Sequence, residues 1–226
     1  MLGRVTGLAI SLMLLAGTTP TRAEDFALEA RAAMVTVQRK PTRSWAGFGV
    51  YLGDGLVLTA AHVAGQNPLM PPLVLVAGRP VDVTVLKLGR YPDDDLAVLR
   101  LDAPVPVELA QRHVTLCEGP PQPGEAVIVA TPDGVATSAV IAPDILPPEM
   151  RARYAASIKD VTTTGNSGSG VFDVGQRCLL GIMSSKIEQE LHGVVDGQPV
   201  TRKVGLAKHF VPPADIKAFL VGVPTR

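Results

Sequence analysis

The chain of 226 residues is 46% hydrophobic but only 4% aromatic, so a core has to be filled mainly with aliphatic side chains. Its 21 basic and 21 acidic residues give a formal net charge of zero at pH 7. This balance excludes the strongly basic surface with which proteins neutralise nucleic-acid phosphates, and we expect no nucleic-acid partner.

The N-terminal residues have the order of a secretory signal peptide. A single cation, Arg4, precedes an apolar run over residues 8–16, and small residues ending at Ala23 follow. Because this run is too short to cross roughly 30 Å of hydrocarbon, the pattern favours a cleaved signal over an uncleaved anchor. We therefore expect a periplasmic or secreted protein that has no membrane anchor once residues 1–23 are removed.

The rest of the chain is predicted to be mostly strands. An Ala-rich segment, residues 24–34, indicates a short helix or an arm, and Pro at the start of residues 212–220 indicates a short C-terminal helix. Between them, short segments rich in Val and Leu are separated by Gly, Pro and Asp-Gly turns. The expected strands are residues 48–52, 56–59, 73–76, 81–88, 96–101, 126–130, 135–141, 170–172, 179–184 and 204–207.

This order of elements predicts an all-β fold. No regular helical pattern of 10 to 15 residues separates the strands, which favours two β units in series over alternating βα units. Proline-rich residues 119–124 mark the expected crossing between the two halves. The predicted organisation is a signal peptide (1–23), an N-terminal arm (24–45), a first β unit (46–110) and a second β unit with a C-terminal helix (111–226).

The chain has two cysteines, Cys117 and Cys178. An even pair in an exported protein is a disulfide candidate because the compartment is oxidising, and two buried free thiols are the alternative. Neither interpretation makes these residues catalytic, since no metal-ligand spacing accompanies them.

Three residues in separate segments have the chemistry of an activated nucleophile. A serine hydroxyl attacks efficiently only when a positioned base takes its proton and a third group orients that base. Ser167 lies in the glycine-rich run GNSGSG (residues 165–170), whose turn would expose its Oγ. His62 follows an apolar strand through three small residues, and a histidine suits proton transfer near pH 7. Asp95 directly precedes another apolar strand, where its carboxylate can be held against the base.

Each of these residues also has a plainer interpretation. Taken alone, GNSGSG is equally typical of a flexible loop, a lone histidine is more often structural, and an acidic residue beside two others is typical of a turn. The remaining histidines stand in less distinctive settings and are assigned structural or surface roles: His113, His192 and His209.

The three segments together resemble the His, Asp and Ser motifs of trypsin-like serine peptidases. They occur in that family's chain order, and the flanking segments GFGV and LGIMS match as well. The resemblance covers residues 47–207 and is nearest to bacterial HtrA-type and glutamyl-endopeptidase-type protease domains, without a PDZ domain. The motifs are TAAHV (residues 59–63), DLAVLRL (residues 95–101) and GNSGSGVF (residues 165–172).

The resemblance implies a chymotrypsin-like fold of two six-stranded antiparallel β-barrels with the active site between them. It assigns His62 as the general base, Asp95 as its orienting group and Ser167 as the nucleophile. The N–H groups of Gly165 and Ser167 would form the oxyanion hole. Asn166 replaces the acid with which zymogen-type members bind a newly cut N-terminus, so activation by that ion pair is not expected.

The same resemblance places the substrate pocket. Val161 stands where trypsin-type members carry an acid, so a preference for Arg or Lys is not expected. Small or medium apolar side chains would suit this pocket, and Lys186 at its rim leaves an acidic preference open. The implied substrate-binding residues are Val161, Thr162, Thr163, Thr164, Ser184, Ser185, Lys186 and Gly205.

The sequence thus predicts an exported serine endopeptidase that acts on a protein or peptide substrate through an acyl-enzyme. The alternative is a trypsin-like fold used as a protein-binding module with little or no turnover, and an esterase is a weaker third interpretation. We expect no cofactor and no metal, because the four histidines do not cluster at ligand spacing. The oligomeric state stays open.

Overall fold

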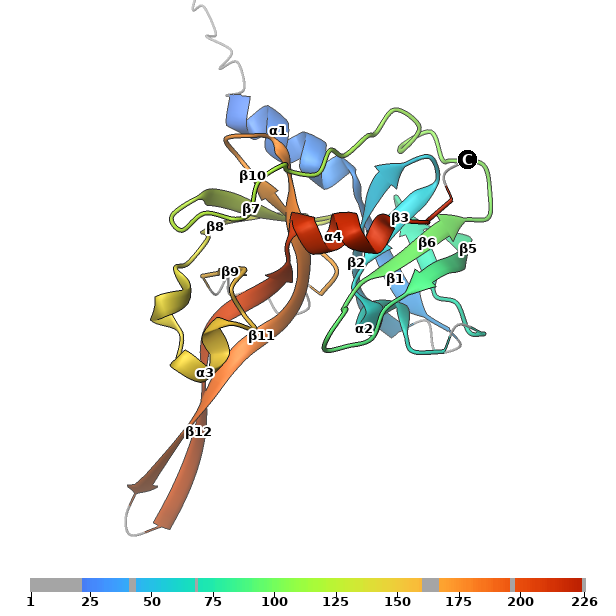
Figure 1. Cartoon of the computed structure of the whole chain (residues 1–226). Helices are drawn as coiled ribbons and strands as arrows, with labels where there is room; N and C mark the ends of the chain where they lie inside the picture. Colours follow the sequence, from blue (N-terminus) through green and yellow to red (C-terminus); the bar gives the residue numbers. More distant parts are fainter. Residues whose placement is uncertain (1–21, 41–43, 68, 160–166, 196–197, 225–226) are drawn as a thin grey trace, which may run out of the picture.

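The computed structural model describes residues 22–40, 44–67, 69–159, 167–195 and 198–224. Strands dominate this part of the chain and form two β units, one from each half of the sequence (Figure 1). The prediction of an all-β fold built from two units in series is confirmed.

The first unit is a closed antiparallel barrel with the strand order β1-β2-β3-β6-β5-β4. Apolar side chains at alternate positions fill its interior, as expected for strands with one face in a core. Strand β1, which the sequence analysis placed in the N-terminal arm, pairs with both β2 and β4. The strands are β1 (Met34–Arg39), β2 (Ser44–Gly53), β3 (Leu56–Thr59), β4 (Leu73–Val76), β5 (Arg79–Leu88) and β6 (Ala97–Leu101).

The second unit is a six-stranded sheet with the order β8-β7-β10-β11-β12-β9. Its two outer strands approach each other, because Val140, just after β8, forms an antiparallel bridge with Ile158 in β9. The sheet is therefore rolled toward a second barrel. The strands are β7 (Ala126–Thr131), β8 (Gly134–Ala139), β9 (Ser157–Ile158), β10 (Gly170–Asp173), β11 (Cys178–Val195) and β12 (Gln198–Val211).

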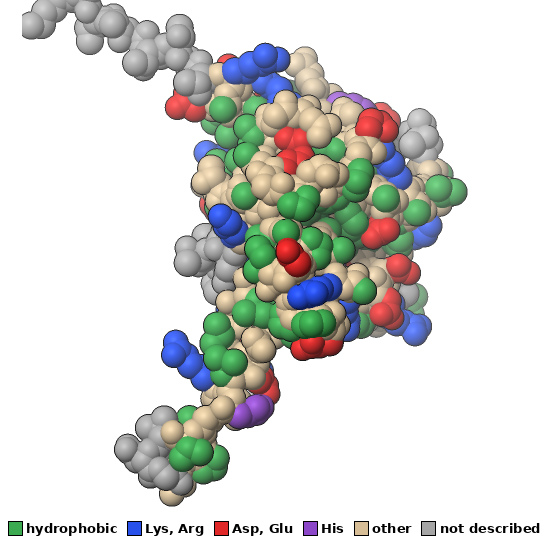
Figure 2. Space-filling view, turned by 60° about the vertical axis from the view of Figure 1, so that its left-hand side comes forward, with side chains coloured by type: hydrophobic (Ala, Val, Ile, Leu, Met, Phe, Trp, Pro, Cys, Tyr) green, Lys and Arg blue, Asp and Glu red, His purple; other side chains and the backbone are tan. Residues whose placement is uncertain are grey.

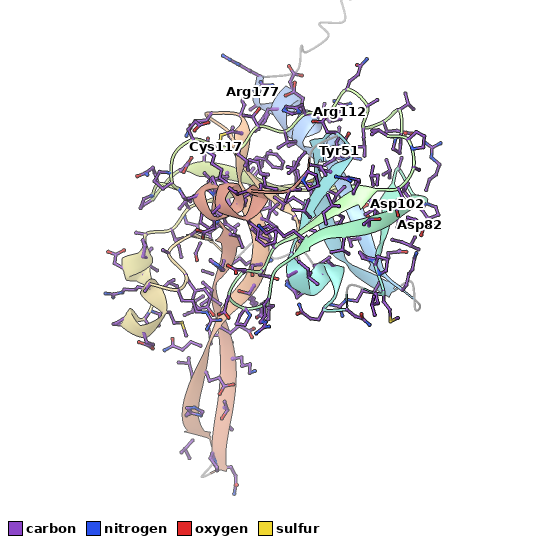
Figure 3. The ribbon with its side chains drawn as sticks, turned by 45° about the vertical axis from the view of Figure 1, so that its right-hand side comes forward. Tyr51, Asp82, Asp102, Arg112, Cys117 and Arg177 are labelled. Carbon is purple, nitrogen blue, oxygen red and sulfur yellow. A yellow bond between two sulfur atoms is a disulfide. The ribbon has the colours of Figure 1, made fainter. Side chains whose placement is uncertain are left out.

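The N-terminal segment forms a helix, α1 (Arg22–Ala32), that packs on the second unit. The ring of Phe26 meets Phe172 of β10 edge to face, with 6.1 Å between centroids. Arg177, which lies beside α1 in Figure 3, pairs with Glu29 at 2.6 Å and lies over the Phe26 ring. These contacts fix the helix across the start of β11. The other helices are α2 (Ala61–Ala64), η1 (Pro143–Ile145), α3 (Pro148–Arg151) and the predicted C-terminal helix, α4 (Pro213–Leu220).

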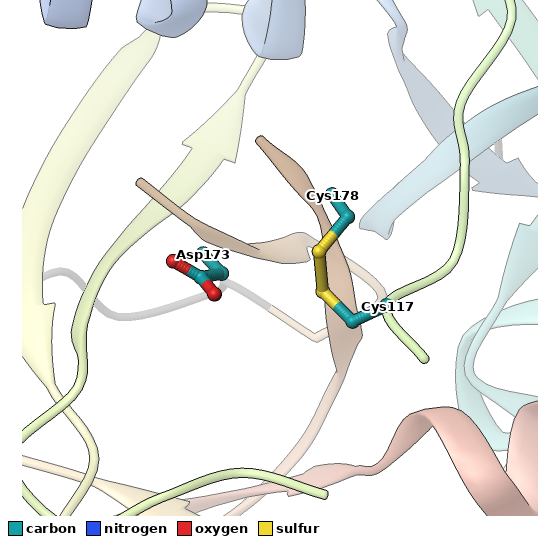
Figure 4. Close-up of side chains that lie close together, drawn as sticks. All are labelled: Cys117, Asp173 and Cys178. Carbon is teal, nitrogen blue, oxygen red and sulfur yellow. A yellow bond between two sulfur atoms is a disulfide. The ribbon is translucent and has the colours of Figure 1, made fainter. Parts of the chain in front are cut away.

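The two cysteines form a disulfide, as the first interpretation predicted. Cys117 lies in the segment that leads into the second unit, and Cys178 begins β11. Asp173 lies close to both sulfur atoms (Figure 4), so the three side chains resemble a set of metal ligands. Because the sulfur atoms are bonded to each other, they are not thiolates and do not offer metal-ligand chemistry.

Strands β11 and β12 are much longer than predicted. The sequence analysis ended the first at residue 184 and began the second at residue 204, whereas the pair extends as a hairpin that projects from the body of the molecule (Figures 1 and 2). Most residues of the projecting part are exposed. The alternation of apolar and polar residues that identifies a half-buried strand is therefore weak there.

The predicted signal peptide falls on residues 1–21, which lie outside the described residues, and on Arg22 and Ala23, which begin α1. None of the helices in the described part of the chain is long and apolar enough to cross a membrane.

Candidate active site

His62 lies in the single turn of helix α2, directly after β3. Small residues make this turn: Ala60 and Ala61 are completely buried, so bulkier side chains would not fit behind the imidazole. The His62 side chain itself is 30% exposed. Its ring meets the Tyr91 ring at an angle of 64°, with 5.3 Å between centroids. The local sequence therefore holds a half-buried imidazole at the surface of the first barrel.

Asp95 directly precedes β6 and is only 1% exposed. Its Oδ1 accepts the backbone N–H of His62 at 3.0 Å, and its Oδ2 accepts the Ser184 hydroxyl at 2.6 Å. Burial alone would raise the pKa of Asp95, but hydrogen bonds from His62 and Ser184 outweigh burial and lower it. The carboxylate is therefore ionised at neutral pH although it is buried.

The imidazole of His62 is oriented by this carboxylate. Nδ1 lies 2.8 Å from Oδ2 and 3.0 Å from Oδ1 of Asp95. An ionised carboxylate only accepts hydrogen bonds, so Nδ1 carries the proton and Nε2 keeps its lone pair in the neutral ring. His62 thus presents a proton acceptor on the side of the ring that faces away from Asp95.

Ser167 is positioned by contacts between its own backbone and the first barrel. Its carbonyl accepts the N–H of Phe48 in β2 at 2.9 Å. Gly168 has a φ of +81°, and a Cβ there would overlap the carbonyl oxygen of Phe48. A Cβ on Gly47 would in turn overlap the carbonyl oxygen of Ser167. The two glycines are therefore required by the close approach of the serine segment to β2.

The side chain of Ser167 points toward β11. Its Oγ donates a hydrogen bond to the carbonyl oxygen of Ser184 at 3.4 Å. Ser184 also donates its own hydroxyl to Asp95, so one residue of β11 contacts both the serine and the carboxylate. Within the described part of the chain, no hydrogen bond joins Ser167 Oγ to His62.

The structure describes only part of the predicted pocket. Ser184 is buried, Ser185 is half-buried, and Lys186 is exposed and pairs with Glu188 at 3.2 Å. Gly205 is exposed on β12, directly across from Glu188. The remaining predicted residues lie outside the described part: Val161, Thr162, Thr163, Thr164 and Gly165, the last of which belongs to the predicted oxyanion hole.

A cavity of about 420 Å³ opens beside Ser184 and Ser185. Tyr91 and His209, which the sequence analysis did not assign to the site, also line it. His209 Nδ1 donates to the carbonyl oxygen of Ala156 at 2.8 Å. Burial lowers the pKa of His209, although this hydrogen bond acts in the opposite direction. His209 comes from a segment distant from the three motifs, and Tyr91 precedes Asp95 by four residues, but no pattern in the sequence assigns either residue to the site.

Comparisons with known proteins identify the family and the fold. The model of the trypsin-like peptidase domain matches residues 47–182, and no curated protein matches the chain.

Three solved structures illustrate the likeness. The inactive form of Rv3671c protease superposes with a TM-score of 0.60 at 14% identity, over 88% of this chain and 92% of that one. The active form of Rv3671c protease, from M. tuberculosis, superposes with a TM-score of 0.59 at 15% identity, over 99% of this chain and 96% of that one. Kallikrein-related peptidase 10 superposes with a TM-score of 0.59 at 18% identity, over 85% of this chain and 95% of that one. At these identities the likeness establishes a chymotrypsin-like fold alone.

Proposed function

The chain belongs to the trypsin-like peptidase family, and we propose that it is an exported serine endopeptidase that uses Ser167, His62 and Asp95. The observation that supports this proposal most is the pair formed by His62 and Asp95. A buried, ionised carboxylate holds Nδ1 of a half-exposed imidazole at 2.8 Å and leaves Nε2 free. A base held in this tautomer is what a serine nucleophile requires.

In the proposed reaction the Ser167 hydroxyl first rotates from the Ser184 carbonyl toward Nε2 of His62. Nε2 takes the hydroxyl proton while Oγ forms a bond to the carbonyl carbon of the substrate. The imidazolium, stabilised by Asp95, then gives this proton to the departing amine as the peptide C–N bond breaks. Water attacks the resulting acyl-enzyme in the same way, with His62 again as the base, and releases the acid product and free Ser167.

The oxyanion formed in each attack needs hydrogen-bond donors. We assign this role to the N–H groups of Gly165 and Ser167, as the family resemblance implies. One such donor typically contributes about 3 kcal/mol to stabilising a transition state. The contact between Phe48 and Ser167 supports the assignment, because it anchors the serine backbone from which one donor comes.

For substrate preference we propose small or medium apolar side chains at the scissile bond. Of the two options that the sequence leaves open, an acidic preference would use Lys186. This ammonium group is already paired with Glu188, and its side chain is 47% exposed. An exposed and neutralised cation gives a bound carboxylate little compensation for its lost hydration. The apolar preference uses Val161, Thr162, Thr163 and Thr164.

Export is proposed from two features. The N-terminal residues have the order of a signal peptide, and the Cys117–Cys178 disulfide fits a periplasmic or extracellular compartment, where disulfides persist.

Cleavage of an internally quenched peptide library tests the activity and the preference together. We expect wild type to cut peptides with small or medium apolar residues before the scissile bond, and Ser167→Ala to show no turnover. Cleavage that persists in folded Ser167→Ala, or a wild type that cuts nothing, would contradict the proposal.

The protein-binding module is the second candidate function. The observation that favours it is the Ser167 hydroxyl, which bonds to Ser184 and not to His62. Titration with an active-site ester that releases a dye separates the two, because a peptidase gives one equivalent of dye in a burst and a binding module gives none.

A further inference from the structure

Strands β11 and β12 extend beyond the body as an arm, defined here as residues 188–195 and 198–205 (Figures 1 and 2). We infer that the outer edge of β11 in this arm binds an extended segment of the polypeptide substrate by strand addition. This inference rests on the proposed function, because it requires that the segment belongs to a chain held at Ser167. It adds a binding surface well beyond the three motifs.

No strand in the described part of the chain covers the outer edge of β11 in the arm. On one side β11 pairs with β12 up to Val195. On the other side it pairs with β10, and this pairing ends at Ile182. Among the described strands, none pairs with that second side beyond Ile182. Unpaired main-chain N–H and C=O groups on a strand edge are a template for another extended chain.

Pro199 reveals which groups this edge presents. Pro199 lies opposite Val194 in the β11·β12 ladder. Proline has no N–H, so within a sheet its nitrogen faces away from the partner strand. Two residues directly opposite each other in an antiparallel ladder either both point their N–H and C=O groups at the partner strand or both point them away from it. These two kinds of pair alternate along the ladder. The N–H and C=O of Val194 therefore point to the free edge of β11.

The same register extends down the arm toward the body. The ladder is regular from Glu188 to Val195. Every second pair from Val194 is thus of the outward-facing kind, and these pairs join Glu188, Glu190 and His192 to residues of β12. Four successive N–H and C=O pairs on β11, at residues 188, 190, 192 and 194, are consequently available to an added strand.

The two edges of the arm are not equivalent. The outer edge of β12 lacks a donor at Pro199, and a proline commonly protects a strand edge from pairing. The β11 side has no proline between Lys186 and Val195. The edge without a proline is therefore the one that leads to the candidate active site.

This edge is continuous with the site. The carbonyl oxygen of Ser184, on β11, lies 3.4 Å from Ser167 Oγ. A polypeptide attached to Ser167 therefore starts beside β11, and Val194 lies roughly 33 Å farther along that strand at about 3.3 Å per residue. A substrate must be unfolded over about ten residues on one side of the scissile bond to use the whole edge.

The side chains of the arm indicate what such a segment would carry. Leu191 is 48% exposed and Val200 is 41% exposed, and the register places them on the same face of the hairpin. Aliphatic side chains at alternate positions of an added strand would pack beside Leu191 and remove it from water. The partner is thus an unfolded polypeptide with aliphatic residues at every second position.

A matched pair of proline variants tests the inference. His192 and Thr201 lie directly opposite each other and share a hydrogen bond of 3.0 Å. His192→Pro removes an outward donor from the β11 edge, and Thr201→Pro removes one from the β12 edge. Both variants lose the same side-chain bond and both keep the ladder between the strands, so they differ only in the edge that is blocked.

Binding is measured in the Ser167→Ala background with reduced, carboxymethylated lactalbumin as a permanently unfolded probe. We expect His192→Pro to weaken binding about fivefold to tenfold, because it removes about one backbone hydrogen bond and disturbs the neighbouring ones. We expect Thr201→Pro to change the affinity less than about twofold. Equal effects of the two variants, or no effect of His192→Pro, would overturn the inference. Replacing residues 189–204 with an Asn-Gly turn provides a second variant, which must also lose binding.

Turnover gives an independent readout. The best eight-residue peptide from the library is extended by ten residues that alternate Val with Thr and Lys, on either side of the scissile bond. We expect one of the two extensions to raise kcat/KM in wild type and in Thr201→Pro but not in His192→Pro, while the unextended peptide is cut equally by all three. If the unextended peptide is not cut at all, the proposed function fails, and the binding assay still decides whether the edge of β11 binds.

Discussion

The two halves of the candidate site are positioned in different ways. In the first barrel, Asp95 is buried and accepts hydrogen bonds from the His62 ring, the His62 backbone and Ser184. On the serine side, Oγ of Ser167 donates a hydrogen bond of 3.4 Å to the Ser184 carbonyl oxygen, and the residue is positioned through its backbone against Phe48. Side-chain hydrogen bonds therefore preorganise the base, whereas close backbone contacts at two glycines position the nucleophile.

The largest expected effect comes from the first half. Asp95→Asn would replace the acceptor by an amide whose NH₂ can face Nδ1, which favours the wrong tautomer of His62. We expect kcat/KM on the library peptide to fall by about 10³ to 10⁴-fold with the fold retained. Asp94→Asn is the control, because Asp94 is exposed, and it should change little. A fall of less than about tenfold in Asp95→Asn would show that the carboxylate does not orient the base.

Removal of the disulfide tests the β unit that carries Ser167. Cys117 and Cys178 are 61 residues apart, and the chain-entropy model gives such a crosslink about 4 kcal/mol. Replacing both cysteines with Ala should lower the free energy of unfolding by about that amount, measured by urea denaturation. The start of β11 should also lose protection from hydrogen exchange. A loss of less than about 1 kcal/mol would mean that packing of α1 alone holds this region.

Gly168→Ala tests the contact between the halves. Its methyl group would overlap the Phe48 carbonyl, and the residue would keep a positive φ, so we expect a loss of about 3 kcal/mol in unfolding free energy together with reduced activity. Gly124→Ala is the matched control, since Gly124 also has a positive φ but a Cβ there meets nothing within 4 Å. It should cost about 1 kcal/mol. Equal losses in the two variants would contradict the proposed role of close approach.

The smallest expected effect concerns pH. Burial lowers the pKa of His209 below 6.5, so the unfolded chain binds a proton there more readily than the folded chain does. Stability should consequently rise with pH until about 6.5 and be lost below it, as pH falls toward the folded pKa. Asp95 acts at lower pH, because its depressed pKa stabilises the fold above about 3.9.

Urea denaturation at pH 7.5 and pH 5.5 measures the His209 effect. His209→Gln should reduce the difference in unfolding free energy between the two pH values relative to wild type. An unchanged difference would show that protonation of another group causes it.

The sequence predicts the fold well where strands bury one face. Residues 73–76 and 56–59 were expected as strands and form β4 and β3 with the same bounds, because aliphatic runs end at clear turns there. Most of the arm was missed, because the predicted strands ended at residue 184 and began again at residue 204. Its strands are stabilised by pairing with each other and not by burial, so they leave no hydrophobic pattern to detect.

Prediction from the sequence is limited in the same way at the candidate site. In the structure, His62 and Asp95 are in direct contact. The sequence placed Ser184 in the substrate pocket, whereas its hydroxyl also bonds to Asp95, and it gave no indication that Tyr91 packs on the His62 ring. Such contacts join residues far apart in the chain, and a single sequence carries no periodic signal for them.

Labelling with a fluorophosphonate tests the central claim most directly. The reagent bonds only to a serine whose proton is removed by a neighbouring base. Mass spectrometry of the labelled wild type should place one adduct on the peptide that contains Ser167, and folded Ser167→Ala and His62→Ala should remain unlabelled. An adduct on another residue, or correctly folded wild type that is not labelled, would contradict the assignment of Ser167 as the nucleophile and His62 as its base.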